Sequence, residues 1–87
     1  MTQPYPPEDR YLVPGLMRGM RLLEKFTHNQ QEWRFSELAR ALELPRSTVF
    51  SLVHTLEKLK YLERHPQRKT FQLGNRVLNL GFEYLAS

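Results

Sequence analysis

Apolar residues recur with a helical period in four stretches of the chain, separated by loops and by one alternating stretch. Residues 1–14 carry four of the six prolines and no period, which predicts a flexible N-terminal tail. From Gly15 to His28 a helical period predicts the first helix. Its expected core-facing positions are Leu16, Met20, Leu22, Leu23 and Phe26. The segment "HNQQEWR" then predicts a loop, from which Trp33 and Phe35 extend back towards the core.

Two helices joined by a very short turn are predicted next. Ser36 is the expected N-cap of a helix over residues 37–44, because a serine hydroxyl accepts a hydrogen bond from a free amide of the first turn. The residues of this helix expected to face inward are Leu38, Ala39 and Leu42. Leu44 closes the corner, and Pro45 is suited to the first turn of the following helix. Helices with so short a connection cross steeply, which indicates a helix-turn-helix.

The third helix, residues 46–59, has two different faces. Its apolar stripe comprises Val49, Leu52, Val53, Leu56 and Leu59. The opposite arc comprises Ser47, Phe50, Ser51, His54 and Lys58. A buried stripe would hold the angle of the helix, and the mostly short side chains on the other arc would let it approach another molecule closely.

After Lys60 the apolar period changes to alternation, which predicts a two-stranded hairpin with a basic tip, "PQRK". Leu62 is expected to pair with Phe71 or Leu73 on one face, with Glu63 and Gln72 on the other. An isolated hairpin is only marginally stable in water, so this one must pack against the helices.

A last helix is predicted over residues 75–87, with Gly74 ending the strand and Asn75 as the cap. It carries two apolar stripes, one of Leu78, Phe82 and Leu85 and the other of Val77, Leu80 and Tyr84. One small domain is expected to cover one stripe, so the second predicts contact with another chain or with a further domain.

The expected fold class is therefore mainly α with a small β-hairpin: a winged helix-turn-helix with a three-helix core, a two-stranded wing and a C-terminal linker helix. In this architecture the second helix of the motif enters the DNA major groove. Hydroxyl and imidazole groups suit base edges, an apolar ring suits the thymine methyl, and cations suit phosphates. The predicted DNA-binding residues are Ser36, Arg46, Ser47, Thr48, Phe50, Ser51, His54, Lys58, Arg68 and Lys69.

Composition agrees with a nucleic-acid partner. The chain has 87 residues, 13 lysines and arginines against nine acids, a net charge of +4 and a pI near 9.8, and this excess favours polyanions. With no cysteine and three widely separated histidines, no metal site is expected. We expect no enzyme, because phosphate loops, nucleophile elbows and paired carboxylates are missing from the sequence. With neither a signal peptide nor a long apolar run, a cytoplasmic location is expected.

Several motifs in order resemble the DNA-binding domain of the IclR family of bacterial transcription regulators. They are "FSELARALEL", "LPRSTV" and "FQLGNRVLNLG", within a resemblance that covers Val13 to Leu85. Two positions depart from the family pattern: Ser51 stands where an arginine is common, and Lys60 where a glycine is common. A left-handed turn at Lys60 would cost about 1 kcal/mol.

The resemblance implies a dimer on an inverted-repeat operator, with residues 15–74 as the DNA-binding domain and residues 75–87 as the linker and dimerisation helix. The predicted dimer-interface residues are Met17, Leu22, Val77, Leu80, Gly81 and Tyr84. Family members continue into an effector-binding domain, so the chain is expected to be a fragment that holds no cofactor itself. A repressor is expected, with activation left open, because the position of the operator decides between the two. A winged helix used for protein–protein contact, without specific DNA binding, is the alternative.

Overall fold

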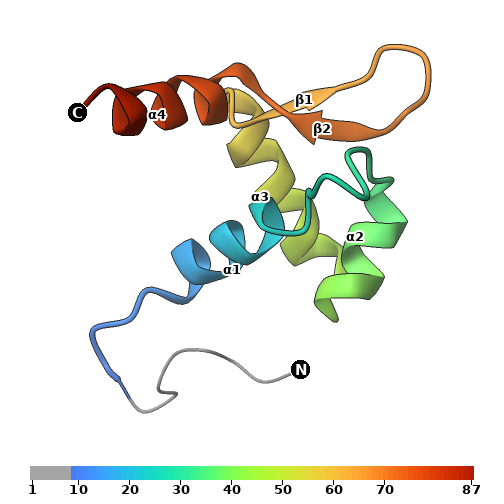
Figure 1. Cartoon of the computed structure of the whole chain (residues 1–87). Helices are drawn as coiled ribbons and strands as arrows, with labels where there is room; N and C mark the ends of the chain where they lie inside the picture. The colour runs from blue at the N-terminus through green and yellow to red at the C-terminus, as the bar shows by residue number, and fades with distance from the viewer. Residues whose placement is uncertain (1–8) are drawn as a thin grey trace.

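The chain forms three helices that pack beneath a β-hairpin and a fourth, projecting helix (Figure 1). This computed structural model describes residues 9–87, so most of the predicted tail lies outside the described residues. The elements are α1 (Pro14–Leu23), α2 (Phe35–Leu42), α3 (Arg46–Lys58), β1 (Leu62–Arg64), β2 (Phe71–Leu73) and α4 (Asn75–Ala86). The predicted fold class is confirmed, because the helix-turn-helix of α2 and α3 is followed by a two-stranded antiparallel wing.

Helix α1 is shorter than predicted, since it ends at Leu23 and not at His28. The amides of Lys25 and Phe26 donate to carbonyls only three residues back, at 3.1 and 3.2 Å, which tightens and ends the helix. Phe26 nevertheless stays buried, with its ring edge-on to Trp33 at 6.4 Å between centroids. The loop therefore supplies a core residue that the periodicity assigned to the helix.

Two residues predicted to face the core from α1 are exposed. Leu16 keeps 64% of its surface and Met20 keeps 45%, whereas Leu22 on the same helix is fully buried. The prediction is wrong for Leu16 and Met20 because nothing within the described chain covers this part of α1. It leaves apolar surface available for another contact.

The turn between α2 and α3 is closed by a Schellman motif. Glu43 has φ 55°, and its amide donates to the carbonyl of Arg40 while the amide of Leu44 donates to that of Ala39. Leu44 packs against the core as predicted. Pro45 is the N-cap of α3 and not, as predicted from the sequence, a residue of its first turn. The left-handed residue turns the chain sharply enough to set α3 across α2.

Two predicted caps are wrong. Arg34, not Ser36, is the N-cap of α2, and its amide donates to the Glu37 carboxylate at 2.7 Å. Helix α2 begins earlier than its polar pattern suggested because Phe35 occupies its first turn and still packs against the core. At the start of α4 the N-cap is Gly74, and Asn75 is already helical.

The core confirms most of the predicted inward positions. Its buried members are Leu22, Phe26, Leu38, Ala39, Leu42, Val49, Val53, Leu62 and Phe71. Leu52 and Leu56 of the α3 stripe are partly buried against this cluster, whereas Leu59 is half exposed at the end of the helix. Only the part of the α3 stripe that faces α1, α2 and the wing is therefore covered.

The wing has a third backbone partner that the sequence did not reveal. Within the hairpin Leu62 pairs with Leu73, Glu63 with Gln72 and Arg64 with Phe71. Trp33 and Phe71 exchange two further backbone hydrogen bonds, of 3.0 and 2.7 Å. The wing is thus tied to the segment that leads into α2, which supplies the support that an isolated hairpin needs.

Lys60 adopts the left-handed conformation that the sequence raised as a cost, with φ 70°. It ends α3 in a second Schellman motif, in which the amide of Tyr61 donates to Leu56. We expect Lys60→Gly to raise the free energy of unfolding by about 1 kcal/mol and the Tm by roughly 4–8 °C, because glycine adopts this conformation without strain. Thermal unfolding measures it. Lys58→Gly, which removes the same charge inside the helix, should instead lower the Tm.

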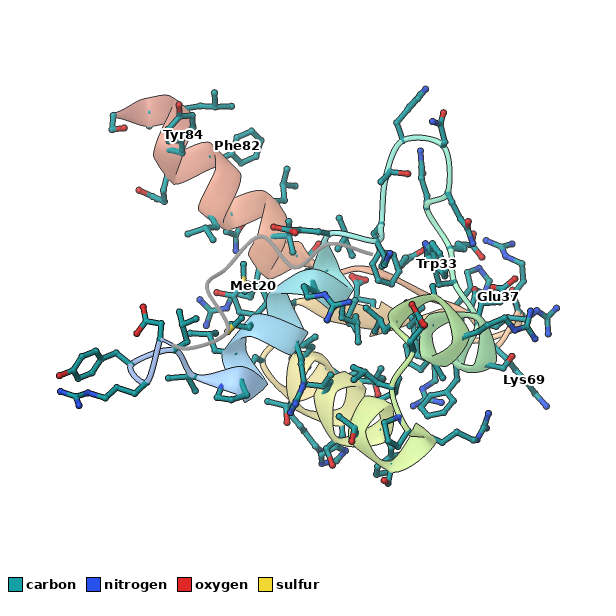
Figure 2. All side chains as sticks on the ribbon, turned by 90° about the horizontal axis from the view of Figure 1, so that it is seen from below. Met20, Trp33, Glu37, Lys69, Phe82 and Tyr84 are labelled. Carbon is teal, nitrogen blue, oxygen red and sulfur yellow. The ribbon has the colours of Figure 1, made fainter. Side chains whose placement is uncertain are left out.

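Helix α4 projects from the hairpin and buries no residue (Figure 1). The prediction that the domain covers one of its two stripes is therefore wrong. Apolar side chains of both stripes are exposed, among them Leu78, Leu80, Phe82, Tyr84 and Leu85. Figure 2 shows Phe82 and Tyr84 on this uncovered helix. Its apolar surface is therefore available for contact with another chain or domain.

Candidate nucleic-acid interface

The polar face predicted for α3 is open to solvent. Ser47, Ser51, His54 and Lys58 are exposed, and Phe50 keeps 61% of its surface. The opposite face is held by Val49 and Val53, which are buried in the core. The structure therefore presents these residues together on the surface of one anchored helix.

Phe50 and His54 form a stacked aromatic pair one helical turn apart. Their ring centroids lie 6.0 Å apart and their planes differ by 9°. Together they line one side of a hollow of about 220 Å³, whose other walls include Lys69 of the wing and Phe71. The two nearly parallel rings lie between α3 and the wing, where they could contact a base edge or a thymine methyl.

The first turn of α3 carries a cation in a fixed position. The Arg46 guanidinium lies 4.9 Å from the centre of the Phe35 ring of α2, a cation–π contact that restrains the side chain without neutralising it. Ser47 follows it on the exposed arc, whereas Thr48 is half buried. The N-terminus of α3 thus combines a positioned charge with a free hydroxyl, which suits a phosphate and an adjacent base.

Ser51 lies on the other flank of α3, away from the wing. It lines a mostly apolar groove with residues of α1 and of the end of α3, including Leu16, Met20 and Leu59. The polar arc is therefore divided. Phe50 and His54 border the wing, and Ser51 borders α1. Lys58 is exposed three turns after Ser47, about 16 Å along the helix. Ser36 is exposed in the first turn of α2.

Arg68 at the wing tip is not free. Its guanidinium donates to both oxygens of Glu32, with Nε to Oε1 at 2.9 Å and Nη2 to Oε2 at 2.6 Å. Glu32 Oε1 also accepts a hydrogen bond of 2.7 Å from the buried hydroxyl of Thr70. The predicted DNA contact of Arg68 stays a prediction. In this structure its guanidinium is held by a carboxylate 36 residues earlier.

A second arginine of the wing is paired in the same way. Arg64 donates to both Glu57 oxygens, at 3.3 and 3.0 Å, and its guanidinium lies 4.8 Å from the centre of the Phe71 ring. These contacts with Glu57 raise the pKa of Arg64, so it remains charged. The pair joins β1 directly to α3.

Lys69 is the wing cation that faces the α3 surface. Its backbone has φ 55°, and its side chain lines the hollow beside Phe50 and His54. Figure 2 shows Lys69 extending outward at the edge of the molecule. No ion pair is recorded for it among the described residues, so its charge is available to a phosphate.

The Arg68 and Thr70 contacts lower the pKa of the Glu32 carboxyl to about 2, with the Arg68 hydrogen bonds as the main cause. We call the contacts of Glu32 with Arg68 and Thr70 the Glu32 clamp. Because the pKa of Glu32 is lowered, the clamp is intact above about pH 4.5 and is lost as the pH falls towards 2. We expect the Arg68 Nε–H resonance in ¹H–¹⁵N spectra to titrate with a midpoint near pH 2. In Glu32→Gln this transition should disappear, and its persistence would contradict the assignment.

The predicted dimer residues divide into three groups by burial. Leu22 is fully buried in the core of the same chain and cannot form an interface, so this prediction is wrong. Leu80, Gly81 and Tyr84 are exposed on α4. The other two, Met17 on α1 and Val77 on α4, are half buried.

The whole arrangement matches a known family. The profile of the IclR helix-turn-helix domain matches residues 15–66, which include α1, the helix-turn-helix and β1. The chain belongs to the IclR helix-turn-helix family. As an IclR domain it is a DNA-binding domain of the kind found in transcriptional regulators, and the resemblance inferred from its motifs is confirmed.

Individual relatives agree with this family. The chain is 30% identical over 79 residues to the Pca regulon regulatory protein of Pseudomonas putida, covering 91% of this chain and 26% of that protein. A crystal structure of an IclR family transcriptional regulator from Brucella abortus shares 36% identity and a TM-score of 0.83, covering 92% of this chain and 31% of that one. An IclR homolog from Microbacterium hydrocarbonoxydans, complexed with 4-hydroxybenzoate, shares 30% identity and a TM-score of 0.71, covering 76% and 27%. The chain therefore spans roughly a quarter to a third of these relatives.

No group of three or more potential metal-ligating side chains occurs among residues 9–87. None of their helices has the length and apolar character needed to cross a bilayer.

Proposed function

We propose that α3 is the recognition helix of this IclR domain and that it enters the major groove of an operator, acting by binding and not by catalysis. The observation that carries the proposal is the exposed arc of α3, where Ser47, Phe50 and His54 stand on a helix anchored by its buried side. Arg46 in the first turn of α3 and Lys69 of the wing would contact phosphates.

We further propose that two copies bind an inverted repeat. Recognition helices of such dimers enter major-groove faces about 34 Å apart. The uncovered stripes of α4 and the exposed Leu16 and Met20 of α1 support this, because a second copy would remove both apolar surfaces from water.

The proposed division of the chain follows the elements. Residues 15–74 would bind DNA, and residues 75–87 would link this domain to an effector-binding domain while contributing to the dimer. A small-molecule effector would bind to that effector-binding domain and not to residues 15–74. The homolog that holds 4-hydroxybenzoate supports an effector of this general kind. Action in the cytoplasm completes the proposal, with the position of the operator deciding between repression and activation.

Selection of bound sequences from random duplex DNA tests the proposal. We expect an inverted repeat to be enriched, and affinity for it to fall several-fold or more per doubling of salt if at least four phosphates are contacted. Failure to enrich any sequence, together with salt-insensitive binding to a protein partner, would favour the protein-interaction alternative.

The dimer proposal predicts a clear effect at one α4 position. Leu80→Asp places a charge in the exposed stripe, so we expect the mass measured by analytical ultracentrifugation to shift from dimer to monomer. Asn79→Asp introduces the same charge at the neighbouring exposed residue outside both stripes and should leave the dimer intact. A wild-type chain that is monomeric both alone and on selected DNA would refute the dimer.

A further inference from the structure

We propose that Glu32 is a positioning residue for DNA binding: by clamping Arg68 and Thr70 it sets the wing so that Lys69, and not Arg68, meets the DNA beside α3. The inference rests on the proposed function, because it assumes that the exposed arc of α3 contacts DNA. It differs from the usual expectation that adjacent basic residues of a wing tip act alike.

The clamp joins two parts of the chain that are distant in sequence. Glu32 lies in the loop before α2, while Arg68 and Thr70 lie 36 and 38 residues later, on either side of Lys69. Both carboxylate oxygens are engaged, one of them twice. A bidentate pair fixes orientation as well as distance, unlike a single-point surface ion pair.

Backbone contacts beside the clamp connect it to the position of the wing. The residue after Glu32 is Trp33, whose backbone pairs with Phe71, the residue after Thr70. The clamp therefore extends a backbone pairing that already joins the wing to the α2 entry. At the tip, His65 Nδ1 accepts hydrogen bonds from the amides of Gln67 and Arg68, at 3.2 and 3.1 Å, so the turn that carries Arg68 is itself ordered.

The two adjacent cations consequently have different surroundings. Arg68 is directed to Glu32, and Lys69 lies in the wall of the hollow that Phe50 and His54 share. The left-handed backbone at Lys69 accompanies this change of direction between neighbouring residues. Because Thr70, immediately after Lys69, is buried and bonded to Glu32, a displacement of the clamp would move Lys69 as well.

The test asks whether loss of the Glu32 carboxylate strengthens or weakens DNA binding. Glu32→Ala removes a negative charge near DNA, so simple electrostatics predicts tighter binding. The positioning role predicts that binding to the selected duplex weakens about 10-fold, while affinity for a random duplex is unchanged or rises. Glu63→Ala makes the same charge change on β1, at a residue that pairs with Gln72 and takes no part in the contacts of Glu32 with Arg68 and Thr70. It serves as the matched control and should not weaken binding to the selected duplex.

Three further variants separate positioning from general structure. Glu32→Gln keeps an acceptor for Arg68 and Thr70 and should recover most of the selectivity for the selected duplex. Lys69→Ala should lower the slope of log affinity against log salt concentration by about one charge on both the selected and the random duplex. Arg68→Ala should reduce the preference for the selected duplex without lowering that slope. Thermal unfolding of every variant confirms that the fold persists, since Glu32 lies outside the buried core.

Tighter binding of Glu32→Ala to the selected duplex would overturn the proposal. So would a lower salt slope in Arg68→Ala, which would make Arg68 itself a phosphate contact. Failure of the wild-type chain to bind DNA would instead overturn the proposed function, and the two failures are therefore distinguishable.

Discussion

Gly74→Ala is expected to destabilise the domain more than any other single methyl addition to its glycines. A Cβ at this position would lie 2.4 Å from the carbonyl oxygen of Lys60 and 3.0 Å from its carbonyl carbon. Both are backbone atoms, and the same Lys60 oxygen accepts a hydrogen bond from the amide of Arg76 at 3.1 Å. The turn at Lys60 and the start of α4 must therefore move apart to admit the methyl group. We expect a loss of about 2–3 kcal/mol, which lowers the Tm by roughly 10–20 °C.

Differential scanning calorimetry or thermal circular dichroism measures this effect. Gly15→Ala is the matched control, because a Cβ there meets nothing within 4 Å and the residue lies in α1, outside the predicted dimer-interface residues. Alanine in place of a helical glycine should stabilise α1 by about 0.5–1 kcal/mol. Similar melting temperatures for Gly74→Ala and the wild-type chain would show that the contact between Lys60 and Gly74 is looser than described.

Loss of the His54 side chain is expected to have the largest effect on DNA recognition. His54→Ala removes a hydrogen-bonding group and one ring of the pair with Phe50, so we expect a cost of about 1–3 kcal/mol for the selected sequence. In titrations with duplexes carrying single base changes, preference should relax at particular positions. Ser47→Ala should relax preference at different positions.

The control for His54 lies on the same helix. Thr55 is exposed beside it, but its hydroxyl is engaged within α3, where it donates to the Ser51 carbonyl at 2.8 Å. Thr55→Ala should therefore leave the base preference unchanged. Equal losses on selected and random DNA for His54→Ala would argue against direct base readout by His54.

The sequence predicted the helix-turn-helix because its signals are local. The stripe through Val49 and Val53, the short turn at Leu44 and the alternation after Lys60 each follow from the periodicity of neighbouring residues. The exposed arc of α3 followed from the same period. Helix ends were predicted less well, because Phe35 and Phe26 are placed by packing against the core and not by capping signals.

Contacts across the fold could not be predicted, since no periodicity relates Glu32 to Arg68 or Trp33 to Phe71. The sequence alone determined the order of the elements, the charge and the residue types on the α3 surface. Only the tertiary structure decided that Arg68 is held by Glu32, that Leu16 and Met20 are exposed, and that neither stripe of α4 is covered. The physical reason is that periodicity records which face of an element is apolar, whereas its neighbour depends on how the chain returns on itself.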